Sequence, residues 1–176
     1  LAIDVLWRAG VNFRLTFQEK RTVIDCQYCL MMAQYNQWMN QTLYQICDGI
    51  PDVERKRDRG AFFGSIHGTL NHLLYGDFAW VGRFKNQPDA IKAIGQDLYA
   101  DFAQLRQVRE QTDREIVSWS VTLAQSWLQQ PCEYTSNMDQ KTRVIPTWIL
   151  VVHLFNRQTH HRGQITTLLS QMGYDV

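Results

Sequence analysis

Hydrophobic residues recur every three or four positions along four long stretches of this 176-residue chain, and this periodicity constrains the fold more than any other feature. The pattern predicts helices over about residues 23–47, 61–84, 95–129 and 146–172. Glycine or proline follows the first and third stretches closely, and Gly173 is placed to cap the last one. Helices of this length joined by mostly short connectors predict an all-α fold, an up-down-up-down four-helix bundle.

Two segments depart from the helical pattern. Residues 131–146 contain β-prone residues on either side of Asn-Met-Asp, which predicts a short hairpin or an ordered loop before the last helix. Residues 52–60 alternate acidic and basic side chains, and we expect a solvated loop there. Met31, Tyr35 and Trp38 share the hydrophobic stripe of the first predicted helix, so we expect them to be buried.

The start of the chain does not follow the periodic pattern. Residues 1–22 mix apolar and basic side chains without a regular period, and they lack the apolar core of a signal peptide. We therefore treat residues 1–22 as an N-terminal extension of unassigned status. The predicted domain covers residues 23–176.

The charge balance argues against two classes of partner. The chain has 18 basic and 17 acidic residues, so it offers no basic surface for nucleic acid. Its longest apolar run, residues 147–155, is too short to cross a bilayer, and we expect no membrane partner. The four cysteines are too few for a disulfide scaffold in a chain of this size, which favours free thiols and a cytoplasmic location.

The last predicted helix carries polar residues where apolar ones are expected. Arg157 and His161 lie four residues apart inside its hydrophobic stripe, so both should face the interior. A buried charge needs a partner, and Asp77 lies inside the stripe of the second helix. We therefore predict an internal ion pair between Arg157 and Asp77. His72 lies to one side of that stripe, beside Gly76 and other small residues that would leave room for a ligand.

The sequence LNHLLYGDFAW around His72, together with HLFNRQTHHRGQITTLLSQMG at residues 153–173, resembles the motif pair of the DinB/YfiT-like family. The resemblance covers about residues 23–173. It implies a four-helix bundle, often dimeric, that holds a divalent metal such as zinc or nickel. The metal ligands implied are one histidine from the second helix and an H-x-x-x-H pair from the fourth. Carried over, His72 matches the first ligand and His161 the last.

The resemblance fails at the middle ligand, where this sequence has Arg157 in place of histidine. An arginine stays protonated and has no lone pair for a metal. His153 lies about 12 Å along the helix from His161, too far to share an ion. His160 is turned about 100° away from His161, so neither histidine is a good replacement.

The remaining polar residues of these helices have supporting roles in this interpretation. Arg157, Asp77, His160 and Gln164 are expected to line the site or to orient its ligands. His67 and His153 are expected at the surface or at the boundary of the core.

Two functional hypotheses follow from the resemblance and from its failure. In the first, the chain is a metal-dependent enzyme, in which the metal lowers the pKa of a thiol or of water and the substrate is a small thiol or electrophile. The alternative is a non-catalytic bundle with a degenerate site, acting as a binding or stress-response module. In both, the resemblance implies a homodimer.

Overall fold

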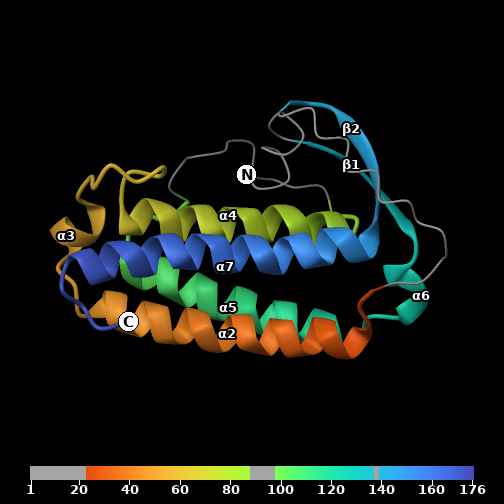
Figure 1. Cartoon of the computed structure of the whole chain (residues 1–176), viewed down its shortest axis with the longest axis horizontal. Coiled ribbons are helices and arrows are strands. Elements are labelled where there is room, and N and C mark those ends of the chain that lie inside the picture. The colour runs from red at the N-terminus through yellow and green to blue at the C-terminus, as the bar shows by residue number, and fades with distance from the viewer. Residues whose placement is uncertain (1–22, 88–97, 137–138) are drawn as a thin grey trace.

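The computed structural model describes residues 23–87, 98–136 and 139–176, and most of these residues are helical. Figure 1 shows four long helices lying alongside one another. In this arrangement α2 packs on α5 and α4 on α7, while α2 also contacts α7 and α4 contacts α5. The long helices are α2 (Cys26–Asp48), α4 (Ile66–Phe84), α5 (Phe102–Val121) and α7 (Thr147–Gln171). The short elements are α3 (Asp52–Lys56), α6 (Gln125–Leu128), β1 (Pro131–Thr135) and β2 (Thr142–Pro146).

Three of the long helices, α2, α4 and α5, begin at side chains that accept from one of their first backbone N–H groups. The carboxylate of Asp25 accepts a hydrogen bond from the Tyr28 N–H at 2.7 Å, and Asp101 caps α5 in the same way. The hydroxyl of Ser65 accepts from the Gly68 N–H at 3.0 Å at the start of α4. These caps explain why α4 and α5 begin several residues after their predicted starts.

The third predicted helix is wrong at its C-terminal end. α5 ends at Val121, and the residues Gln125–Leu128 form the separate short helix α6. The hydroxyl of Thr122 donates to the Trp119 carbonyl at 2.8 Å, offering that carbonyl a partner other than the next helical N–H. Residues 95–97 of the prediction lie outside the described residues.

The segment before α7 forms the hairpin that was one of the two predicted alternatives. Its strands β1 and β2 are antiparallel, and their register pairs Pro131 with Pro146 and Thr135 with Thr142. The ring of Tyr134 lies 5.2 Å from that of Trp80 on α4, so the hairpin packs onto the helices.

The connector after α2 is mostly exposed, as its charges predicted, but it is not simply a loop. It contains α3, and Arg55 within it is buried. The Arg55 guanidinium donates to the Cys47 carbonyl at 2.9 Å and also to the Ile50 carbonyl, so it satisfies backbone acceptors at the end of α2. The alternating charges did not distinguish Arg55 from its neighbours, because its role depends on the end of α2, which only folding brings close to it.

Several side chains of α2 have the opposite burial to the one predicted. Met31 and Trp38 are 55% and 60% exposed, whereas Asn36 and Asn40 are buried. The prediction followed hydrophobicity alone, and it failed because the interior of this protein is polar at the level of these two asparagines.

No helix in the described ranges is both long and apolar enough to traverse a bilayer.

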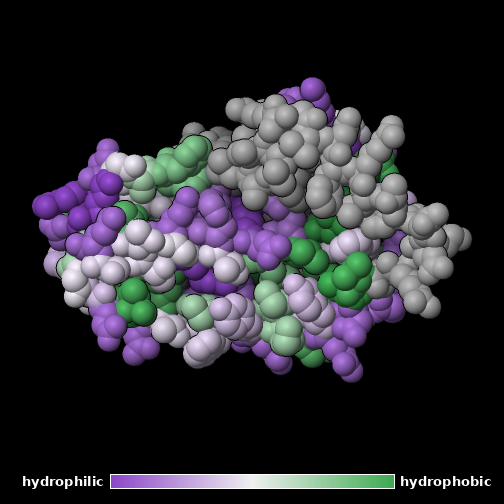
Figure 2. Space-filling view, in the orientation of Figure 1, coloured by the Kyte–Doolittle hydropathy of each residue, from purple (hydrophilic) through white to green (hydrophobic). Residues whose placement is uncertain are grey.

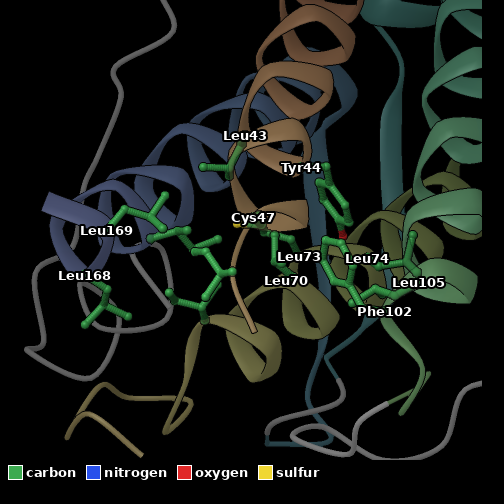
Figure 3. Close-up of a cluster of buried hydrophobic side chains, with 13 residues drawn as sticks. Leu43, Tyr44, Cys47, Leu70, Leu73, Leu74, Phe102, Leu105, Leu168 and Leu169 are labelled. Atoms are coloured by element: carbon green, nitrogen blue, oxygen red, sulfur yellow. The ribbon is translucent and has the colours of Figure 1, made fainter. Parts of the chain in front are cut away.

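The buried apolar residues form two clusters near opposite ends of the long helices. Figure 3 shows one of them, to which Leu43 of α2, Leu70 of α4 and Leu105 of α5 belong. The other gathers Phe84, Trp119 and neighbouring side chains near the hairpin. On each long helix at least one buried charged or amide side chain lies between the parts that join the two clusters: Asn36 and Asn40 on α2, Asp77 on α4, Arg109 and Asp113 on α5, and Arg157, Gln158 and Arg162 on α7. Figure 2 shows hydrophilic residues in the middle of this face, and more strongly hydrophobic ones toward the end with the hairpin.

Candidate functional site

All four long helices contribute to a buried polar layer between the two apolar clusters. Asp77 and Arg109 are 0% and 2% exposed and lie at its centre. Arg109 donates from Nη1 to Asp77 Oδ2 at 2.5 Å and from Nη2 to Asp113 Oδ1 at 2.7 Å. The polar layer consists of Asn36, Asn40, Asp77, Arg109, Asp113, Gln158 and Arg162.

The other members of the polar layer extend these ion pairs to α2 and α7. Asn40 donates to Asp113 Oδ1 at 3.0 Å, and Gln158 donates to Asp77 Oδ1. Arg162 donates to the side-chain oxygen of Asn36. Because buried charges are stable only when they are paired and hydrogen-bonded, this layer fixes which polar residues of the four helices must meet.

Electrostatics keep Arg109 charged in this setting. Burial lowers the pKa of its guanidinium, but attraction to Asp77 and Asp113 outweighs that effect, so the net pKa shift is upward. Burial raises the pKa of the Asp113 carboxyl to about 6, with the Arg109 charge opposing that rise. Arg109 was not among the site residues predicted from the sequence. It lies four residues after Leu105 and three before Thr112, inside the predicted stripe of the third helix, which is the signal that singled out Arg157.

Arg157 is buried as predicted, but its main partners are different. Its Nη1 lies 4.0 Å from Asp77 Oδ1, at the limit of an ion pair, because Arg109 is the close partner of that carboxylate. The guanidinium instead donates to the backbone carbonyls of His72 at 2.5 Å and Leu73 at 3.3 Å. Burial lowers the pKa of Arg157 to about 10, and Asp77 offsets this only in part. Arg157 is therefore still a cation at neutral pH.

The room that the sequence predicted beside His72 is filled. A β-carbon added at Gly76 would overlap the central carbon and both terminal nitrogens of the Arg157 guanidinium. The space above Gly76 therefore holds the Arg157 head group.

The structure brings His72 and His161 together, and we call them the histidine pair. Their ring centroids are 4.7 Å apart, with an interplanar angle of 79°. Both are buried, at 9% and 1% exposure. Phe63, in the connector before α4, stacks on the His72 ring at 3.7 Å and meets the His161 ring edge-on at 5.6 Å. Helix periodicity did not single out Phe63, which lies before the start of α4, and its neighbour Phe62 is 71% exposed.

Each ring of the histidine pair has one buried nitrogen without a hydrogen-bond partner among the described residues. His161 Nδ1 lies 2.8 Å from Gln164 Oε1, and when that oxygen accepts the bond, the lone pair of the ring is on Nε2. His161 Nε2 and His72 Nδ1 have no hydrogen-bond partner within the described residues. Burial is the main cause that lowers the pKa of His72 to about 2 and of His161 to about 4. The Arg157 charge also lowers both pKa values, so both rings are neutral at pH 7.

The other three histidines lie outside the pair. His160 is exposed, and its ring centroid lies 4.9 Å from that of the neighbouring His161. The prediction that His67 and His153 lie at the surface or boundary is wrong, because both are buried. His67 Nε2 is 2.9 Å from the Tyr99 carbonyl, and the His153 ring is 5.1 Å from that of Trp80. Other segments cover both residues, which helix periodicity alone does not reveal.

The residues around the histidine pair do not fit a tightly held divalent metal. Two imidazole nitrogens suit zinc or nickel, but zinc sites in proteins use three or four protein ligands. No group of three or more histidine, cysteine, aspartate or glutamate side chains suited to a metal occurs within the described ranges. The position of the family's middle ligand holds Arg157, which offers no lone pair and adds a positive charge.

These features define a mostly helical protein with a polar interior and a histidine pair contributed by α4 and α7. The chain belongs to the DinB family, because the model of that family matches residues 23–176. It is also similar to Protein DinB of Bacillus subtilis (strain 168), with 25% identity over 159 residues, 84% of this chain and 87% of that protein. No solved structure gives a significant match to the chain.

Proposed function

We propose that this DinB-family chain is a non-catalytic binding module whose histidine pair receives a small ligand without a tightly held metal of its own. The observation that carries this proposal is Arg157. It occupies the position of the family's middle ligand, and it is buried and hydrogen-bonded to the carbonyls of α4. A guanidinium in that position removes one of the three nitrogen ligands and repels a cation.

The histidine pair suits a ligand that donates a hydrogen bond. Neutral imidazoles accept through their unprotonated nitrogens, and His161 Nε2 is held ready to accept by Gln164. The Phe63 ring beside them adds an apolar wall. A small thiol, which combines a weak S–H donor with an apolar body, meets both requirements and is the ligand class that we propose.

Metal content tests this proposal directly. Wild-type protein purified without chelator should contain well below one zinc or nickel per chain, and neither ion should raise its Tm. The variant Arg157→His should gain metal, because it restores the third imidazole at a spacing that suits a shared ion. The double variant R157H/H161A is the control, and it should lose that gain. One equivalent of zinc or nickel in dialysed wild-type protein would overturn the proposal.

A second candidate function is the metal-dependent enzyme acting on small thiols or electrophiles, with His72 and His161 as ligands. The unpartnered nitrogens of these two residues favour it, since metal-binding histidines need one free nitrogen and an oriented ring. This candidate predicts that the wild-type protein binds metal and that the single variants His72→Ala and His161→Ala each fail to bind it.

We also propose that the four long helices form the up-down-up-down four-helix bundle of the family, and that the chain works in the cytoplasm as a homodimer. The pairing of α2 with α5 and α4 with α7 supports the bundle. The exposed Met31, Tyr35 and Trp38 on α2 give the dimer an apolar contact surface. Sedimentation equilibrium should give twice the chain mass of 20.7 kDa, and Trp38→Glu should shift it to the monomer.

A further inference from the structure

Gly76 lies in the middle of α4 and is buried there, although alanine is the better residue for a helix interior. Its position differs sharply from that of Gly163 on α7. A β-carbon at Gly76 would overlap three guanidinium atoms of Arg157, whereas a β-carbon at Gly163 has no neighbour within 4 Å. The absence of a side chain at Gly76 therefore has a specific consequence, and at Gly163 it has none.

The contacts of Arg157 explain why its head group lies against Gly76. The carbonyls that accept from it, those of His72 and Leu73, belong to residues four and three positions before Gly76. These positions share one face of the helix with Gly76, so the two acceptors and the missing side chain form a single notch. The guanidinium in this notch makes no hydrogen bond to either unpartnered nitrogen of the histidine pair.

We infer that Gly76 is the positioning residue that determines the character of this site. It lets the arginine at the middle ligand position lie on α4, so the guanidinium bonds to backbone carbonyls and leaves the two buried nitrogens of the histidine pair without a partner. With any side chain at position 76, the guanidinium has to leave the notch. This inference deepens the proposed function and rests on it, because it names the residue that keeps the Arg157 guanidinium from bonding to the ring nitrogens of the histidine pair.

A thermodynamic cycle tests the inference through a change of sign. Gly76→Ala in the wild-type background should lower Tm by several degrees, because it displaces a buried cation from its hydrogen bonds. In an Arg157→Ala background the same change should raise Tm by roughly 2–4 °C, the effect of replacing glycine by alanine in a helix. Gly163→Ala is the matched control, and it should raise Tm by a similar amount in both backgrounds.

A spectroscopic reading separates positioning from general packing. In Gly76→Ala the imidazole C–H resonances of His72 and His161 should move, because a charge near them has moved. In G76A/R157A they should coincide with those of R157A alone, since the effect of position 76 passes through Arg157. If R157A does not fold, Arg157→Gln takes its place in both cycles.

Equal Tm effects of Gly76→Ala in both backgrounds, or histidine shifts in G76A that persist without Arg157, would overturn the inference. Neither result depends on metal content. If this cycle fails, the proposed function is still tested by the metal content of the protein. If the wild-type protein contains metal, the role of Gly76 is still tested by this cycle.

Discussion

Two buried arginines, Arg109 and Arg157, illustrate two different ways of placing a cation inside this protein. Arg109 lies between two carboxylates at 2.5 and 2.7 Å, and they raise its pKa despite burial. Arg157 is held mainly by two backbone carbonyls, and burial lowers its pKa to about 10. The comparison shows that Arg109 is held mainly by the charges of two carboxylates, whereas Arg157 is held mainly by hydrogen bonds to the backbone of α4.

The largest expected effect comes from removing the strongly paired arginine. Arg109→Met should cost about 3–5 kcal/mol of unfolding free energy, because it removes the close countercharge of both Asp77 and Asp113, which stay buried. Urea denaturation measures the loss. Arg106→Ala is the control, because its ion pairs with Asp48 and Glu110 are partly exposed and should be worth no more than about 1 kcal/mol. A loss below that of the control would contradict the role assigned to Arg109.

Removing the weakly paired arginine should cost less. Arg157→Met should lower the unfolding free energy by no more than about 2 kcal/mol, because it removes hydrogen bonds but leaves no carboxylate without its main partner. Urea denaturation beside Arg109→Met gives the ratio of the two losses. Equal losses would mean that Asp77 depends on Arg157 as much as on Arg109, and the comparison would then fail.

Acid should destabilise the protein through its buried neutral histidines. The folded pKa values of His72, His153 and His161, about 2, 3 and 4, lie below the ordinary value of 6.5. The unfolded chain therefore binds more protons between pH 6.5 and 4, and stability falls as pH falls through that range, by up to about 1.4 kcal/mol per pH unit for each histidine. Asp113 acts in the opposite direction between about pH 4 and 6, because its folded pKa is raised to about 6.

Urea denaturation at pH 7, 6 and 5 measures this dependence. The double variant H72Q/H161Q should have a shallower decline, because two of the titrating groups are gone. A wild-type stability that rises as pH falls from 6.5 to 5 would contradict the neutral, buried state of the histidine pair.

The smallest effect is expected at Gln164, which forms a hydrogen bond with His161 of the histidine pair. Its hydrogen bond raises the pKa of His161, opposing the larger effect of burial. Gln164→Ala should therefore lower that pKa further, below about 4, while stability changes by no more than about 1.5 kcal/mol. NMR titration of the His161 ring follows the pKa, with the exposed Gln171→Ala as control. An upward shift would show that the bond does not favour the protonated ring.

Sequence reasoning located part of the site and missed its strongest interaction. It selected His72, His161, Arg157 and Asp77 as interior residues, and all four are buried. The predicted partner of Asp77 was incomplete, because a charged residue on a third helix lies closer to it than Arg157 does. Periodicity gives the face on which a residue lies. It does not give the distance between faces of different helices, so it could not choose between two arginines.

By itself the sequence determined the helical character of the chain, its membership of the DinB family and the arginine at the position of the middle ligand. These follow from local periodicity and from residue identity, which do not depend on how helices pack. Only the tertiary structure decided that Arg157 lies on Gly76, that Phe63 stacks on His72 and that Asn36 and Asn40 replace Trp38 in the interior. These contacts join residues far apart in the chain, and they form where the burial of many groups at once gives the lowest free energy.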